Sequence, residues 1–88
     1  MPTEKEIRDR LVREVADATR TPADRIDVRE PFASYDLQSI DAVYLVGELE
    51  SWLGMPLDAT LLWDHATIEA LARHLATVVK DTAGGSSP

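Results

Sequence analysis

Between Ser39 and Gly54 the chain reads SIDAVYLVGELESWLG, and apolar residues recur there at steps of three and four. Spacing of this kind is typical of an amphipathic α-helix. Serine is favoured at the start of a helix and glycine just beyond its end, while Pro56 opposes any extension. The segment therefore predicts a helix from about Ser39 with a wide apolar face, made of Ile40, Ala42, Val43, Leu45, Val46, Leu49 and Leu53.

An earlier helix is predicted to begin near Thr3. Thr3 and Glu6 have the spacing of a capping box, in which each side chain satisfies a free backbone N–H of the first turn. Pro22 makes it unfavourable for this helix to continue through residue 22. The apolar stripe of this helix consists of Ile7, Leu11, Val15 and Ala18.

The connection between these two helices, residues 20–38, is long for a small domain. We expect residues 21–24 to form a short helical turn. We also expect four apolar side chains to pin the connection to the core, namely Ile26, Val28, Phe32 and Leu37.

The second half of the chain predicts two more helices. A short helix or turn is expected around residues 61–63, Leu-Leu-Trp, with Trp63 packed in the core; Trp52 could be buried or exposed. Thr67 is a suitable N-cap for a last helix, whose apolar side chains are Ile68, Leu71, Ala72, Leu75 and Val78. The pattern ends after Lys80, and residues 81–88 have the composition of a flexible tail.

These segments together predict an all-α domain over residues 1–80. Three longer helices and one short helix would close as a four-helix bundle on one small core. No segment alternates over the length of a strand, and the chain has no cysteine to supply disulfides or thiolate ligands.

The charge balance bears on partners. Acidic residues outnumber basic ones, 16 to 9, for a formal charge of −7. Such a surface repels phosphate backbones, so we expect no nucleic-acid partner, and basic protein surfaces are the natural complement. No apolar stretch is long enough to cross a bilayer and the N-terminus lacks a signal-peptide core, so we expect a cytoplasmic protein without membrane contact, monomeric as an isolated domain.

The sequence indicates no active site. His65 and His74 are nine residues apart, which is not a metal-binding spacing. No glycine-rich phosphate loop or nucleophile elbow is present. We therefore expect a non-catalytic protein that binds no metal.

Ser39 has two interpretations from its position alone. It can act simply as an N-cap, or it can carry a phosphate-linked group, since free N–H groups and the positive end of the helix dipole suit an anion. Position does not choose between them.

The neighbouring residues carry a family resemblance. Residues 32–45, FASYDLQSIDAVYL, resemble the phosphopantetheine attachment region of acyl carrier proteins, which usually reads Gly-Leu-Asp-Ser-Leu. Residues 60–68, TLLWDHATI, resemble the third-helix segment of carrier domains in modular polyketide synthases. The resemblance covers roughly residues 7–79. It departs from the family at Asp36, Gln38 and Ala66, where glycine, aspartate and proline are usual, and the lost charge at Gln38 could narrow or weaken modification.

The resemblance implies an acyl carrier with 4'-phosphopantetheine on Ser39. A phosphopantetheinyl transferase would deliver the arm from coenzyme A, and its thiol would hold acyl or polyketide intermediates as thioesters. Ketosynthase, acyltransferase and other synthase domains would be the partners. They would recognise residues on and beside the second helix, namely Gln38, Ile40, Asp41, Val43, Tyr44 and Glu48.

Within that set we expect Ile40 to be exposed, whereas Val43 could belong to the surface or to the core. Two other functions stay open at this point. One is a peptidyl carrier of nonribosomal synthetases, which shares the fold and the arm. The other is a helical interaction module without a modification site, which the substitution at Gln38 keeps possible.

Overall fold

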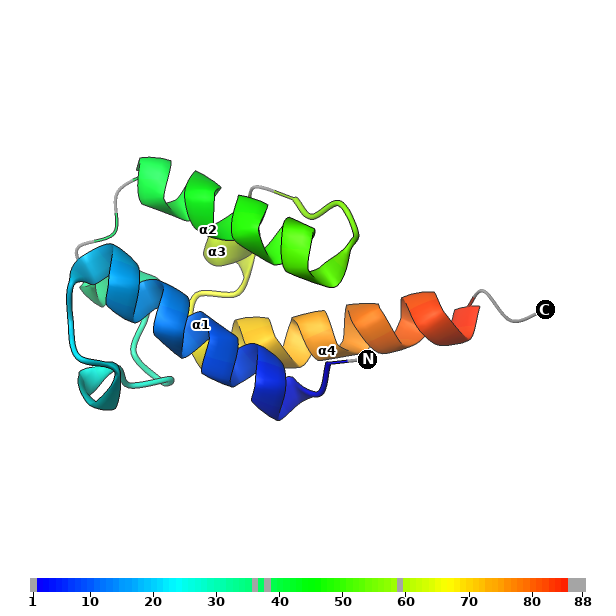
Figure 1. Ribbon diagram of the computed structural model, residues 1–88, viewed down its shortest axis with the longest axis horizontal. Coiled ribbons are helices and arrows are strands. Elements are labelled where there is room, and N and C mark those ends of the chain that lie inside the picture. The colour runs from blue at the N-terminus through cyan, green and yellow to red at the C-terminus, as the bar shows by residue number, and fades with distance from the viewer. Residues whose placement is uncertain (1, 36, 38, 59, 86–88) are drawn as a thin grey trace.

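The computed structural model describes residues 2–35, 37, 39–58 and 60–85 (Figure 1). Over these residues it contains no strand, and Pro31 and Thr67 form an isolated bridge. The predicted all-α fold of three longer helices and one short helix is confirmed. The elements, in order, are α1 (Glu4–Thr19), the 3-10 turns η1 (Ala23–Arg25) and η2 (Phe32–Ser34), α2 (Ser39–Leu53), α3 (Leu61–Asp64) and α4 (Ile68–Gly85).

The start of α1 has the predicted capping box. The Thr3 hydroxyl accepts a hydrogen bond from the Glu6 N–H at 3.2 Å, and the Glu6 carboxylate accepts one from the Thr3 N–H at 3.1 Å. Ile7, Leu11 and Val15 are fully buried, as predicted. The expected burial of Ala18 is wrong: Ala18 is exposed, and Ala16 is buried instead at the end of α1 that contacts η1.

The connection between α1 and α2 is pinned where the sequence predicted. Phe32 is buried, while Ile26, Val28 and Leu37 are half-buried and pack against the core. Two backbone hydrogen bonds fasten the connection to the start of α4, from the Phe32 N–H to the Ala66 carbonyl at 2.7 Å and from the Glu69 N–H to the Val28 carbonyl at 2.9 Å. The expected helical turn is present as η1, slightly later in the chain.

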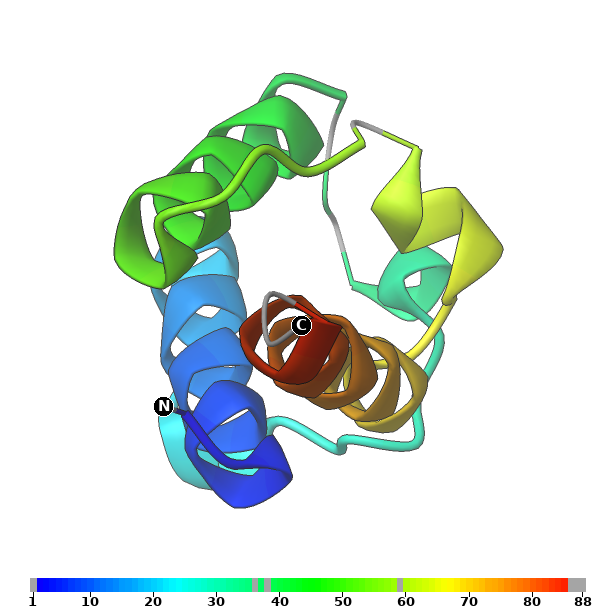
Figure 2. The same cartoon turned by 90° about the vertical axis from the view of Figure 1, so that its right-hand side faces the viewer.

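The core lies between α1, α2 and α4, with α3 closing one side. In the view along the long axis, α2 and α3 stand on opposite sides of the molecule (Figure 2). Gly54 has a φ of 69°, a left-handed conformation that suits glycine, and it ends α2 as predicted. The buried side chains of the second half are Ala42, Leu45, Val46, Leu49, Leu61, Leu62, Ile68, Leu71, Ala72, Leu75 and Val79.

The last helix begins as predicted but ends later. The Thr67 hydroxyl accepts a hydrogen bond from the Ala70 N–H at 3.0 Å, which is the geometry of an N-cap. Val78 is half-buried and the next residue, Val79, is buried. Although the apolar pattern stops at Lys80, α4 continues to Gly85. The domain boundary at residue 80 and the tail at 81–88 stay predictions. No helix in the described part of the chain combines the length and apolar character that a membrane crossing requires.

Candidate functional site

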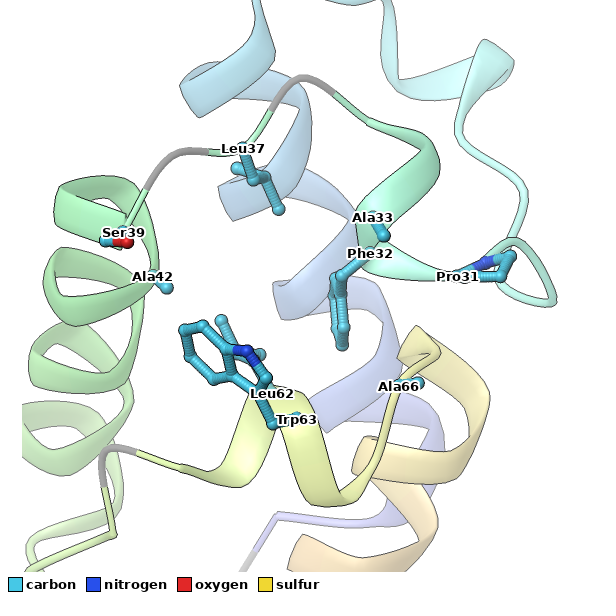
Figure 3. A pocket seen from close by; sticks show the side chains of 9 residues that line it. All are labelled: Pro31, Phe32, Ala33, Leu37, Ser39, Ala42, Leu62, Trp63 and Ala66. Atoms are coloured by element: carbon cyan, nitrogen blue, oxygen red, sulfur yellow. The ribbon is translucent and has the colours of Figure 1, made fainter.

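Ser39 is the first residue of α2 and its side chain is exposed. It lies at the edge of a pocket of about 310 Å³ that opens between α2, η2 and α3 (Figure 3). Apart from Ser39, the lining side chains are all apolar or aromatic. They are Pro31, Phe32, Ala33, Leu37, Ala42, Leu62, Trp63 and Ala66.

The position of Ser39 bears on the two interpretations of its hydroxyl. An N-cap stands at the boundary of a helix, and Ser39 is the first residue of α2. Ser39 is exposed, and it lies at the helix start, where the first backbone N–H groups have no partner within the helix. These features fit a phosphodiester at this oxygen. Gln38, the preceding residue of the predicted site, lies outside the described residues.

The segment of sequence that contains this site has acidic side chains but no lysine or arginine. From Glu30 to Ala72 the chain has no lysine or arginine, and it has eight acidic residues, namely Glu30, Asp36, Asp41, Glu48, Glu50, Asp58, Asp64 and Glu69. A phosphate on Ser39 would therefore find no basic side chain within this segment. The positive end of the α2 dipole is the favourable electrostatic feature next to Ser39.

The predicted core position of Trp63 is wrong. Its side chain is 64% exposed, while the neighbouring Leu61 and Leu62 are buried. A helix as short as α3 buries one side only, so the residue after two buried leucines turns outward. The indole projects from α3 toward α2 and lines the same pocket as Ser39 (Figure 3). Trp52, left open by the sequence, is half-buried, with the Arg10 guanidinium carbon 5.2 Å from its ring centroid.

The predicted recognition residues on α2 form an exposed apolar surface. Ile40 is 75% exposed, as expected, and Val43 and Tyr44 are 61% and 64% exposed. Asp41 and Glu48 are half-buried. A hydrogen bond to the Glu48 carboxylate, together with the charge of that carboxylate, raises the pKa of Tyr44. The structure thus brings apolar and acidic side chains together on the helix that begins at Ser39.

A pair of histidines links α3 to α4. His65 follows α3, His74 lies on α4, and their rings stack with centroids 4.0 Å apart and planes 17° apart. Burial and the neighbouring His65 lower the pKa of His74, against a smaller opposing effect of Asp64. No group of three or more potential metal-ligating side chains occurs among the residues that the structure describes.

The histidine pair predicts a loss of stability in mild acid. Because the folded-state pKa of His74 lies below the ordinary value of 6.5, the unfolded chain binds the proton first as the pH falls. The His74 contribution to stability is therefore present above about pH 6.5 and is lost as the pH falls toward the folded-state value. We expect His74→Gln to lose less stability than the wild type between about pH 7.5 and about pH 5.5 in urea denaturation.

The partner ring provides the control for that measurement. His65→Gln removes one of the two causes that lower the pKa of His74, so that pKa should move upward in an NMR titration of the imidazole. An unchanged titration of His74 in this variant would show that the ring stack does not influence it.

The sequence of this chain is similar to that of known proteins. Residues 9–75 match the sequence model of the family described as phosphopantetheine attachment site. The chain is 37% identical over 71 residues to a phenolphthiocerol/phthiocerol polyketide synthase subunit of Mycobacterium tuberculosis, a match that covers 81% of this chain and 4% of that protein. The chain thus spans only a small part of the length of such curated relatives.

Two solved structures are similar over most of their length. A free-standing peptidyl carrier protein from Acinetobacter baumannii has a TM-score of 0.84 and 35% identity, covering 88% of this chain and 96% of that one. An acyl carrier protein from Anabaena sp. PCC 7120 has a TM-score of 0.81 and 35% identity, covering 88% of each chain. The latter is described as having a variant phosphopantetheinylation-site sequence.

Proposed function

The chain belongs to the phosphopantetheine-attachment family, and from this premise we propose that Ser39 carries the prosthetic group on its Oγ atom. The domain is a carrier that tethers intermediates for synthases, and its prosthetic group is 4'-phosphopantetheine. The observation that carries the assignment to Ser39 is its exposed hydroxyl in the first turn of α2, inside the matched segment.

The other serines of the matched segment fit the group less well. Ser34 lies in η2 and Ser51 lies near the end of α2, and both are exposed. Neither is placed beside the free N–H groups of a long helix, so neither offers an equivalent site for a phosphodiester. Exposure alone therefore does not favour Ser39 over these serines, whereas exposure combined with its place at the helix start supports the proposal.

The attachment reaction needs only a reachable hydroxyl from this chain. The Ser39 oxygen forms a new bond to the phosphorus that bears the pantetheine in coenzyme A, the diphosphate bond breaks, and adenosine 3',5'-bisphosphate leaves. The serine proton passes to a base of the transferase. The attached thiol supplies the site at which acyl groups are held, and Ser39 fixes where that thiol is tethered.

Intact-mass spectrometry tests this proposal. The wild-type chain is incubated with coenzyme A and a promiscuous phosphopantetheinyl transferase. We expect its mass to increase by one phosphopantetheine. No increase would reject the attachment site, and it would favour a helical interaction module that lost its modification through a change such as Gln38.

We also propose the type of pathway and the partners. The similarity to polyketide synthase components supports acyl or polyketide cargo, with ketosynthase and acyltransferase domains as partners. The similarity to a peptidyl carrier protein supports a second candidate, aminoacyl cargo of a nonribosomal synthetase. We further propose a cytoplasmic domain that is monomeric in isolation and leaves catalysis to its partners. Binding assays against isolated domains of both synthase types would separate the two candidates.

The recognition surface proposed for these partners lies on α2. Ile40 and Val43 would form its apolar centre and Asp41, Tyr44 and Glu48 its polar rim, with Gln38 as a further contact. Exposed apolar side chains with a charged rim are typical of transient protein interfaces. The absence of basic residues from Glu30 to Ala72 supports partners with a basic surface.

Charge reversal tests the recognition surface. We expect Glu48→Lys to weaken binding to a basic partner domain by about two- to fivefold at low salt, because rim charges contribute modestly. The control is Asp24→Lys, which changes the net charge equally but lies on η1. Fluorescence polarisation at low and high salt would measure both affinities. Equal losses in the two variants would show that net charge, and not the α2 surface, governs binding.

A further inference from the structure

Tyr35 lies four residues before Ser39, and its side chain combines an apolar anchor with a polar contact. The ring is half-buried and packs against the core. The hydroxyl reaches back eight residues along the chain to Asp27. There it accepts a hydrogen bond from the Asp27 N–H and donates one to the Asp27 carbonyl, each 2.8 Å long. A hydroxyl can do both at once because it has one proton and two lone pairs.

The backbone that Tyr35 holds is itself fixed to the rest of the fold. Asp27 lies between Ile26 and Val28, whose side chains both pack against the core. The Val28 carbonyl also accepts a hydrogen bond of 2.9 Å from the Glu69 N–H, in the first turn of α4. The Tyr35 hydroxyl therefore ties the end of the long connection to a point that is anchored on α4.

Only three residues separate Tyr35 from Ser39. The Tyr35 carbonyl accepts a hydrogen bond of 2.7 Å from the Leu37 N–H, and the Leu37 side chain is half-buried against the core. The first turn of a helix frays readily, since its N–H groups have no partners within the helix. An anchor at Tyr35 limits fraying at Ser39, because the incoming chain has few residues over which it can relax.

We propose that Tyr35 is a positioning residue for the modification of Ser39. Through its contact with Asp27, the Tyr35 hydroxyl holds the chain before Ser39 in the conformation that a phosphopantetheinyl transferase binds. The inference rests on the proposed attachment at Ser39. Loss of the contact leaves the Ser39 oxygen and its chemistry intact, but it lowers the fraction of molecules in the binding conformation.

The expected size of the effect follows from the hydrogen bonds that are lost. The net contribution of one hydrogen bond corresponds to about a two- to tenfold change in an equilibrium constant. Both bonds between Tyr35 and Asp27 are exposed to water, so we expect a change in the lower part of that range. A smaller competent fraction weakens the apparent affinity in proportion, whereas a saturating concentration restores the full rate. KM for the carrier chain should therefore rise and kcat should stay the same.

Tyr35→Phe tests this role because it keeps the packed ring and removes the hydroxyl. Coenzyme A is saturating, the concentration of the carrier chain is varied, and loading by a promiscuous transferase is followed by intact mass. We expect KM for the chain to rise by about two- to fivefold with kcat unchanged. An unchanged KM, with or without a lower kcat, would overturn the inference while leaving attachment at Ser39 intact. No mass gain in the wild type would instead reject the proposed attachment, and this role with it.

Ile7→Val is the control for a general loss of stability. Ile7 is fully buried in the first turn of α1, which lies on the opposite side of the molecule from the start of α2 (Figure 1 and Figure 2). Loss of one buried methyl group lowers stability by an amount comparable to that of a lost hydrogen bond. We expect KM in this variant to match that of the wild type. A similar rise of KM in both variants would overturn the role of Tyr35.

Amide hydrogen exchange on the unloaded chain measures the effect of the contact without a transferase. In Tyr35→Phe the Asp27 N–H loses its acceptor, and the segment that contains Leu37 loses its upstream anchor. We expect both amides to exchange about two- to tenfold faster than in the wild type, while Ile7→Val leaves their rates unchanged. Unchanged exchange at Leu37 in Tyr35→Phe would show that the hydroxyl does not hold the chain before Ser39, which would overturn the inference.

Discussion

Replacing Ser39 with alanine is expected to abolish loading of the phosphopantetheine arm while the domain stays folded. The variant lacks the oxygen that forms the bond to phosphorus, so its mass should stay unchanged after incubation with coenzyme A and transferase. Ser39 is exposed and lies inside the first turn of α2, so the free energy of unfolding should fall by no more than about 1 kcal/mol. Intact mass and urea denaturation measure the two effects separately.

The controls for this variant are the two other exposed serines in the family-matched segment. Ser34→Ala and Ser51→Ala remove hydroxyls from η2 and from the later part of α2, and both should be loaded to the wild-type extent. A mass gain in Ser39→Ala would place the attachment site elsewhere. Loss of loading in all three would indicate that the transferase recognises a wider surface than one hydroxyl.

Leu49→Ala is expected to cost a large share of the total stability. Leu49 is fully buried on the inner face of α2, and truncation of a buried leucine costs about 2–5 kcal/mol. A domain of 88 residues has a total stability of roughly 4–13 kcal/mol at the usual value per residue. Urea denaturation should therefore show a much lower midpoint with a similar slope.

A substitution on the exposed face of α2 is the comparison for Leu49→Ala. Ile40 is 75% exposed, so Ile40→Ala should change the free energy of unfolding by no more than about 0.5 kcal/mol. Similar losses for the two variants would mean that α2 packs differently from the arrangement described above. A large loss for Leu49 alone would confirm that α2 keeps one apolar face inside and another in solvent.

Local signals in the sequence predicted the ends of several helices. The capping box of Thr3 and Glu6, the N-cap at Thr67 and the left-handed Gly54 involve residues only a few positions apart. Their geometry depends mainly on the nearby backbone, so the residue types suffice to predict it. Helical spacing likewise predicted four of the buried residues of α4, namely Ile68, Leu71, Ala72 and Leu75, but it pointed to Val78 where Val79 is buried.

The sequence was less informative where tertiary contacts decide orientation. Trp63 is a large aromatic residue beside two buried leucines, and only the shortness of α3 turns it outward. Apolar residues cover so much of α2 that spacing alone could not separate the buried ones from the exposed ones. For this reason the sequence did not predict whether Val43 is buried or exposed. The His65–His74 stack joins residues on different elements, and no local pattern predicts it.

The candidate site was predicted only in part by physical reasoning. Position alone left Ser39 between a helix cap and a phosphate carrier, and the family resemblance of residues 32–45 and 60–68 chose between them. The pocket beside Ser39 could not be foreseen, since its walls come from η2, α2 and α3 and depend on how these pack. The role of each recognition residue stays a prediction that the binding experiments address.

Positively charged side chains are unevenly distributed along this chain. All nine cationic side chains lie before Glu30 or after Ala72, in parts of the chain that include α1 and α4. A positively charged protein at a distance would thus exert a torque on the freely tumbling domain and turn its η2–α2–α3 side forward. More ions in the buffer would screen this effect, so encounters would become slower and more randomly oriented.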